Sequence, residues 1–127
     1  MTRRNVVVYL SGKLSDPNPK LQARNISCAR VMSAILWNLG FTVICPHTNA
    51  PQAIVGCKCS YDDYLEGDIQ LMLRCDCVFM MSGWMSSKGS VIEHQAAADK
   101  RLPIFYDTKA LLKHADDVIG GKDDPYN

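Results

Sequence analysis

The sequence predicts an α/β fold, a three-layer sandwich in which a parallel sheet of four to five strands lies between helices. Short apolar segments rich in β-branched residues alternate along the chain with segments of helical periodicity. Glycine, proline and polar residues concentrate between these segments, as expected of loops. The length of 127 residues, with 47% hydrophobic and 21% charged residues, is typical of one globular domain that spans residues 1–127.

The first strand is expected at residues 5–10, where a continuous apolar run indicates a strand buried on both faces. A long helix is expected at 19–39, because Asn18 suits the N-cap, Pro19 the first helical position and Gly40 the C-terminal stop. Helical spacing predicts its buried face to hold Ala29, Met32, Ile35, Leu36 and Leu39.

A second strand is expected at residues 41–45. The segment 47–60 lacks clear periodicity, and a connection this long in a compact domain is more often functional than idle. A second helix is expected at 60–74, because Ser60 and Asp63 have the spacing of a capping box, with Asp in place of Glu.

The remaining elements continue the alternation. A third strand is expected at 76–81, a third helix at 89–101 and a fourth strand at 102–106. A short final helix follows, capped by Asp107 and ending near Ala115, and residues 118–127 are expected to form a mobile tail.

Ligands of parallel α/β folds bind outside the carboxyl ends of the strands. In this chain, three segments follow predicted strands and precede predicted helices: 11–18, 46–60 and 82–90. These segments are therefore the candidates for a binding site.

Charge and hydropathy exclude several functions. The chain has 14 Lys and Arg against 13 Asp and Glu, a net charge of +1, which disfavours binding to nucleic-acid polymers or to an anionic membrane. No apolar run approaches the roughly 20 residues of a membrane span, and the run after the N-terminal arginines is too short for a signal peptide. We therefore expect a cytoplasmic protein whose six cysteines are free thiols and bind no metal.

Asp68 is the most informative single residue, because it lies near the middle of an apolar helical stripe. The other members of the stripe are Tyr61, Tyr64, Leu65, Met72 and Cys75. A carboxylate that faces a core is costly unless it is paired or used, which favours a functional role. The alternative is a slightly rotated helix that carries Asp68 at the margin of the stripe.

Glu93 lies one turn into the third predicted helix, after a segment with the serines Ser87 and Ser90 and the glycine Gly89. Backbone N–H groups at such a helix start can bind an anion, and glycine permits close approach. The segment is no P-loop, because the run GxxxxGK[ST] is absent. Glu93 itself is either a site carboxylate or a surface residue that complements the helix dipole.

Other candidates flank the predicted site. Ser11, Gly12 and Lys13 follow the first strand and form either an anion contact or a simple turn. Tyr9 can reach the site with its hydroxyl or belong to the core, and Trp84 can wall a pocket or fill a gap beside the sheet. His47 is a candidate ligand contact in the loop after Pro46.

Separated motifs in the chain resemble the nucleoside 2-deoxyribosyltransferase superfamily. They are VYLSG at residues 8–12, GDI at 67–69 with CD at 75–76, and SKGSVIE at 87–93. The similarity is greatest to the 2′-deoxynucleoside 5′-monophosphate N-glycosidase branch and to short phage and bacterial relatives that carry a Gly-Trp loop, here at 83–84. It covers residues 6–105 and implies a flavodoxin-like, Rossmann-like fold.

The resemblance also implies a mechanism. The residue matching Glu93 attacks the anomeric carbon, the residue matching Asp68 handles the proton at the base, and the residue matching Tyr9 orients the nucleophile. A carboxylate nucleophile with a nearby acid suits a reaction that develops oxocarbenium character on a sugar. No cofactor is implied, and a homodimer or higher homo-oligomer is expected.

The position six residues before the nucleophile distinguishes substrates within this superfamily. Base-exchanging transferases usually carry an acid there, whereas this chain carries Ser87. A serine beside a helix start accepts a phosphate that an acid would repel, which favours a nucleoside 5′-monophosphate substrate. Ser11, Gly12, Lys13 and Gly89 are expected to hold the phosphate with Ser87.

Two alternatives stay open from the sequence. One is base exchange between free deoxynucleosides. The other is a module that binds or senses nucleotides without turnover, because a fold of this class does not by itself determine function.

Overall fold

Four parallel strands form the centre of the fold in the computed structural model, which describes residues 1–48 and 57–123. They are β1 (Val7–Ser11), β2 (Thr42–Ile44), β3 (Cys77–Met80) and β4 (Ile104–Phe105), in the spatial order β2-β1-β3-β4. The register sets Val8 of β1 opposite Val43 on one side and Cys77 on the other. The predicted parallel sheet is confirmed, with β1 and β3 as its inner strands.

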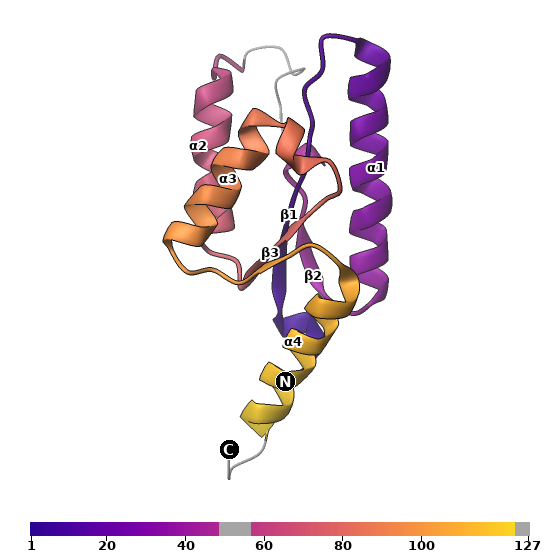
Figure 1. The fold of residues 1–127 in the computed structure, drawn as a ribbon, viewed down its shortest axis with the longest axis vertical. Helices are drawn as coiled ribbons and strands as arrows, with labels where there is room; N and C mark the ends of the chain where they lie inside the picture. The colour runs from indigo at the N-terminus through magenta and orange to yellow at the C-terminus, as the bar shows by residue number, and fades with distance from the viewer. Residues whose placement is uncertain (49–56, 124–127) are drawn as a thin grey trace.

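Helices cover both faces of the sheet, which confirms the predicted three-layer, flavodoxin-like architecture. They are α1 (Pro19–Asn38), α2 (Tyr61–Met72), α3 (Lys88–Asp99) and α4 (Thr108–Asp123). In Figure 1, α1 lies on one side of the strands and α2 and α3 lie on the other. No helix within the described ranges is both long and apolar enough to cross a membrane.

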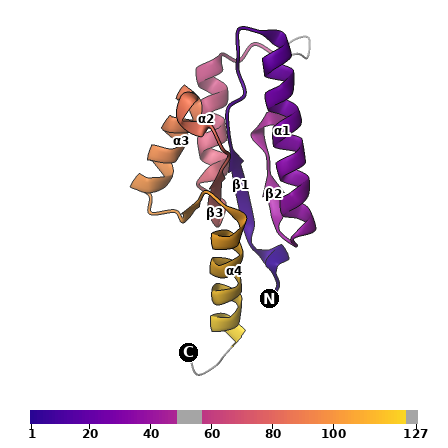
Figure 2. The same ribbon diagram turned by 45° about the vertical axis from the view of Figure 1, so that its right-hand side comes forward.

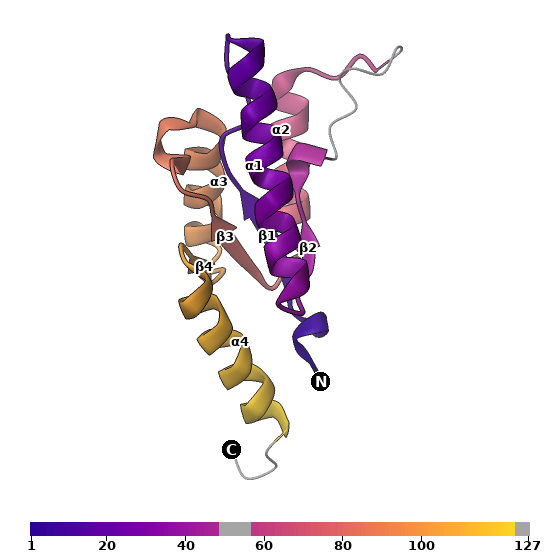
Figure 3. The ribbon, with the colours of Figure 1, turned by 90° about the vertical axis from the view of Figure 1, so that its right-hand side faces the viewer.

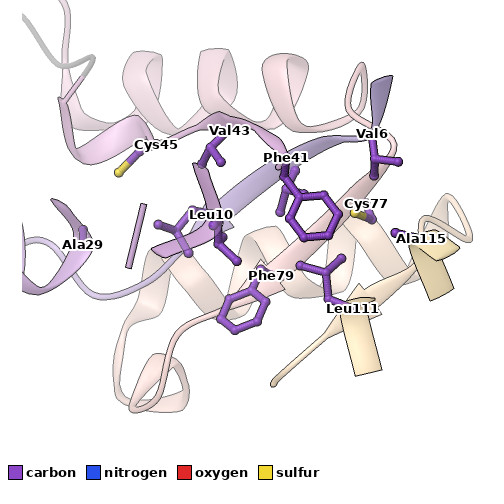
Figure 4. Close-up of a cluster of buried hydrophobic side chains, with 12 residues drawn as sticks. Val6, Leu10, Ala29, Phe41, Val43, Cys45, Cys77, Phe79, Leu111 and Ala115 are labelled. Carbon is purple, nitrogen blue, oxygen red and sulfur yellow. The ribbon is translucent and has the colours of Figure 1, made fainter. Parts of the chain in front are cut away.

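Side chains of β1 alternate between the two layers, as expected of a strand. Val8 and Leu10 pack in one buried cluster with residues of α1 and α4, such as Ala29 and Leu111 (Figure 4). Tyr9 points to the opposite face and packs in a second cluster with residues of α2 and α3. This alternation turns the hydroxyl of Tyr9 toward α3, where the candidate site lies.

The predicted helix starts are confirmed by their hydrogen bonds. The Asn18 side chain accepts from the N–H of Lys20 at 3.0 Å. Ser60 and Asp63 form the expected reciprocal capping box, with distances of 2.8 Å and 3.1 Å. Asp107 accepts from the N–H of Ala110 at 2.8 Å. Side chains of the predicted types therefore satisfy N–H groups that a helix start leaves unpaired.

Two details of the predicted helices are wrong. Ile35 is 42% exposed, because Ala29, Met32, Leu36 and Leu39 form the buried face of α1 without it. Ile35 instead lines a largely apolar groove of about 680 Å³ between α1 and the segment that joins β4 to α4.

The last helix continues to Asp123 instead of ending near Ala115, so the prediction of a mobile tail is wrong for residues 118–123. Leu111, Ala115 and Ile119 follow at four-residue spacing and all pack against the core, so the apolar face extends past the predicted end. Arg3 adds an ion pair with Asp116 at 2.9 Å. Figure 3 shows α4 running along and beyond the end of the sheet at which the N-terminus lies. Residues 49–56 of the predicted long segment and 124–127 of the predicted tail lie outside the described residues.

All six cysteine thiols are free. Cys75 and Cys77 are buried beside the sheet, where burial raises the pKa of Cys75 to about 11 and that of Cys77 to about 12. Both thiols therefore stay protonated at neutral pH and behave as apolar groups. In the part of the chain that the structure describes, no three His, Cys, Asp or Glu side chains gather in a way that would hold a metal ion.

The packing of α4 can be tested by truncating Leu111, whose side chain is 0% exposed. We expect Leu111→Ala to lower the free energy of unfolding by about 2–5 kcal/mol, because it removes buried methyl groups and leaves a cavity. Lys109→Ala, at an exposed position of the same helix, is the matched control and should change it by less than about 0.5 kcal/mol. Chemical denaturation measures both, and equal effects would contradict a docked α4.

Candidate active site

A cavity of about 370 Å³ lies at the carboxyl ends of the inner strands. This volume is within the range of roughly 300–1,000 Å³ that is usual for small-molecule sites. Figure 2 shows α1, α2 and α3 all starting from this end of the sheet. The lining comes from all three predicted segments and from two helices: residues 12–15, 46–47 and 86–90, with Tyr61, Tyr64, Leu65 and Asp68 of α2 and Glu93 of α3. The position of the site is therefore as predicted.

Glu93 is the most constrained side chain of the cavity. It is 6% exposed, and its two carboxylate oxygens accept hydrogen bonds from different donors of β1. The hydroxyl of Tyr9 donates to Oε2, and the hydroxyl of Ser11 donates to Oε1 at 2.9 Å. Burial raises the pKa of Glu93, the two hydrogen bonds act against this effect, and the charge of Asp68 adds to it. The carboxylate is thus fixed in orientation while it still faces the cavity.

Tyr9 lies beneath the cavity, with a side chain that is 0% exposed. Burial, followed by the nearby charge of Glu93, raises its pKa above the ordinary range, so the phenol keeps its proton and donates. Tyr9 is therefore a core aromatic residue whose hydroxyl reaches the Glu93 carboxylate, and its role in orienting a nucleophile stays a prediction.

Ser11 has a different place from the one predicted. We expected its hydroxyl to hold an anionic ligand, but the residue is 0% exposed and donates to Glu93. The reason is strand geometry: residues 9 and 11 share one face of β1, so Ser11 points with Tyr9 toward α3. Ser11 therefore helps to hold the carboxylate of Glu93 in place and does not line the cavity.

Asp68 lines the same cavity from α2 and is half-buried. Burial raises the pKa of Asp68 to about 6. No hydrogen bond or ion pair to its carboxyl group is formed by residues of the described ranges. The prediction that Asp68 faces inward from the apolar stripe is confirmed, and its environment favours a carboxyl group that can exchange a proton near neutral pH.

The start of α3 forms another wall of the cavity. Ser87 caps the helix by accepting from the N–H of Ser90 at 3.2 Å. The two N–H groups between the cap and Ser90, those of Lys88 and Gly89, have no acceptor among the residues that the structure describes. Ser90 is 1% exposed, and its hydroxyl is buried without a partner in that same part of the chain. Unpaired donors at a helix start attract an anion.

Two glycines of the lining lie close to neighbouring side chains. A Cβ atom at position 12 would lie 2.8 Å from the sulfur of Met81 and 3.0 Å from its Cβ atom, so a side chain there would push Met81 away. A Cβ atom at position 89 would lie 2.7 Å from the Tyr61 hydroxyl oxygen, the end of an exposed side chain that can move aside. Both glycines line the cavity as predicted, and each lets a neighbouring segment pack closely against the backbone.

Lys13 and His47 bring the first two loops together. The ring Nε2 of His47 lies 3.0 Å from the carbonyl oxygen of Lys13, and both residues line the cavity. The Lys13 ammonium group lies 3.6 Å from Asp16, so a carboxylate already accompanies its charge.

Trp84 does not wall the cavity. Its ring stacks on His94, with ring centroids 4.3 Å apart, and lies 6.2 Å from the ring of Tyr106. Trp84 also packs against the buried cluster on the α2 and α3 side of the sheet. Of the two alternatives given for Trp84, the structure favours the one in which the indole fills a gap beside the sheet.

Several residues that line the cavity were not predicted from the sequence as site residues. Tyr61, Tyr64 and Leu65 of α2 line the cavity beside Asp68. Their signal was present, since they belong to the same stripe. Lys88 also lines the cavity, and no carboxylate in the described ranges pairs with it. The sequence feature that could have predicted Lys88 as a site residue is its place between Ser87 and Gly89 at a helix start.

Comparison with known proteins gives one family. No curated protein matches the sequence. Residues 6–106, which include every element from β1 to β4 and all of the cavity described above, match a family model described as "Domain of unknown function (DUF4406)". The chain therefore belongs to the DUF4406 family.

Proposed function

We propose that the protein hydrolyses the N-glycosidic bond of a (deoxy)nucleoside 5′-monophosphate. The observation that carries the proposal is the carboxylate of Glu93, which is buried, held by Tyr9 and Ser11, and open to a cavity that it shares with Asp68. A fixed carboxylate with a second carboxyl group nearby, whose pKa is raised to about 6, is the combination that glycosidic cleavage requires. The resemblance to nucleotide N-glycosidases indicates the class of bond that is cleaved, the N-glycosidic bond between the base and the sugar.

In the first step, an oxygen of Glu93 attacks C1′ of the sugar. The C1′–N bond breaks, the electron pair stays on the base, and Asp68 gives its proton to the departing base. Tyr9 and Ser11 hold the attacking carboxylate in place, so little orientational freedom is lost on reaching the transition state. The products of this step are the free base and a sugar esterified to Glu93.

In the second step, water attacks C1′ and the ester bond to Glu93 breaks. Asp68, now ionised, takes the proton from the water, and the sugar 5-phosphate leaves. If a second base replaced the water, the result would be base exchange, which is the related transferase reaction. The assay below therefore includes an acceptor base.

The start of α3 is the proposed phosphate site. The N–H groups of Lys88 and Gly89 have no acceptor within residues 1–48 and 57–123. Together with the buried hydroxyl of Ser90 and the positive end of the helix dipole, they support an anion there. Lys88 and Lys13 supply positive charge at the same cavity. A near-neutral chain can thus bind one phosphate without a basic surface.

Self-association and a cytoplasmic location stay predictions. Several large apolar side chains are exposed in and near the groove beside α1, among them Val31 at 62% and Tyr106 at 54%. Such exposure is compatible with an interface between subunits, which the resemblance implies.

The proposal is tested by incubating the purified protein with a panel of ribo- and deoxyribonucleoside 5′-monophosphates and measuring free base by chromatography. We expect base release from at least one of them. Glu93→Gln should lower the rate at least about a thousandfold, because the amide cannot attack C1′. Glu66→Gln removes an exposed carboxylate of α2 and is the matched control.

Absence of base release from every nucleotide, with a folded protein, would refute hydrolysis. Binding of a nucleotide without release would then indicate the non-catalytic module. Formation of a new nucleoside in the presence of a second base would indicate the transferase.

The pH dependence of kcat/KM tests the role of Asp68. The acid must be protonated in the first step, and its pKa is raised to about 6, so kcat/KM should fall as the pH rises above about 6. On the acid side, the rate should fall as Glu93 becomes protonated. Asp68→Asn should remove the fall above pH 6 together with most of the activity, whereas Asp62→Asn, at an exposed position of the same helix, should leave the profile unchanged. A flat profile between pH 5 and 8 would exclude Asp68 as the acid.

Ser87 provides a test of the phosphate site that preserves the helix cap. Asp and Asn are both good N-caps, so Ser87→Asp and Ser87→Asn should have similar stability. The added charge of Ser87→Asp should raise KM for the 5′-monophosphate at least about tenfold relative to Ser87→Asn. It should not raise KM for a free nucleoside in this way, and equal KM values for the two variants would place the phosphate elsewhere.

A further inference from the structure

One buried nitrogen at the cavity is not used by the proposed mechanism. His47 is 7% exposed, and its Nδ1 atom has no hydrogen-bond partner among the described residues. Buried polar atoms are rarely left unpaired in a folded protein, because each costs roughly 1–3 kcal/mol. Since His47 lines the cavity, a ligand is a natural source of the missing partner.

The other ring nitrogen determines what this partner must be. Nε2 of His47 lies 3.0 Å from the backbone carbonyl oxygen of Lys13, and a carbonyl oxygen can only accept. The proton is therefore assigned to Nε2. Burial lowers the pKa of His47, so the ring is neutral at pH 7 and Nδ1 carries a lone pair. Nδ1 is an acceptor that needs a donor.

No other titratable or charged group of the described lining donates a hydrogen bond to Nδ1. Lys13 lies in the loop that holds Nε2, and its ammonium group is near Asp16. Asp68 and Glu93 line the cavity from α2 and α3, and no hydrogen bond joins either of them to His47. Tyr61, Tyr64 and Lys88 also make no hydrogen bond to the ring within the described ranges.

The order of the strands places His47 relative to the reaction. His47 follows β2, the start of α3 follows β3, and β1 lies between them. Glu93 is fastened to this central strand by Tyr9 and Ser11. A nucleotide with its phosphate at α3 and its C1′ at Glu93 therefore extends its base toward the β2 side of the cavity, where His47 lies.

We propose that Nδ1 of His47 accepts a hydrogen bond from an N–H group on the base of the substrate, so that the site selects bases that carry such a donor at the edge facing β2. This inference rests on the proposed function and names the part of the substrate that the site recognises. It also separates two roles: His47 lacks a proton on the nitrogen that meets the base, so protonation of the departing base is left to Asp68.

A pair of nucleotides that differ only in the donor provides the test. Adenine 2′-deoxynucleoside 5′-monophosphate carries an amino group, whereas the corresponding purine nucleotide has the same ring and no N–H group. Affinities are measured by calorimetry in a Glu93→Gln background, which prevents turnover. We expect the adenine nucleotide to bind about tenfold more tightly, the effect of one hydrogen bond to a buried acceptor.

Two variants in that background assign the preference to His47. His47→Phe should abolish the difference between the two nucleotides, because it has no acceptor. His47→Asn should retain part of it, because its amide oxygen can accept. Equal affinities with His47 present, or an undiminished preference in His47→Phe, would overturn the inference. Should His47→Phe fail to fold, the nucleotide pair and the Asn variant still decide the question.

Nitrogen NMR of labelled histidine gives an independent readout. A proton on Nε2 of His47 at pH 7 supports the inference, and a proton on Nδ1 overturns it. The two proposals also fail separately. Base release that depends on Glu93 but shows no preference for a donor refutes the role of His47 alone, whereas a binding preference without base release refutes hydrolysis alone.

Discussion

The hydrogen bonds that Tyr9 and Ser11 donate to Glu93 join the centre of the sheet to the first turns of α3, and the geometry of the site depends on them. A carboxylate that is 6% exposed is costly unless its oxygens are satisfied. Both donors come from β1 and lie two residues apart, so the pleat of one strand aims them at one target. An inner strand of the sheet thus also positions the carboxylate of the candidate site.

The same strand explains why the cavity is where it is. The chain leaves β1 for β2 on one side and later returns to β3 on the other, so the loops that follow β1 and β3 diverge. Asp68 and Glu93 reach the resulting cavity from α2 and α3 of one layer, yet their surroundings differ. Two hydrogen bonds act against the effect of burial on the pKa of Glu93, whereas burial raises the pKa of Asp68 with no hydrogen bond from the described residues to oppose it.

Much of this arrangement could be predicted from residue patterns. The apolar run at residues 5–10 and the caps at Asn18, Ser60 and Asp107 are local signals, because a strand buried on both faces and an unpaired helix start each require particular residue types. The inward position of Asp68 followed from helical periodicity alone. The errors arose where a neighbour far along the chain decides: Ile35 is exposed because it faces a groove that the described residues leave open, and α4 is longer because the core continues beneath Ile119.

The sequence by itself determined the alternation of elements, the edge of the sheet at which a site forms, and the types of polar residue gathered there, because all of these depend on local periodicity and chain order. Only the tertiary structure decided what each polar residue does. Ser11 and Ser87 look alike in the sequence, yet one is buried against Glu93 and the other caps a helix at the cavity. His47 became informative only through its contact with a carbonyl group 34 residues away along the chain. A hydrogen bond has direction, and its direction is set by elements that meet only when the chain has folded.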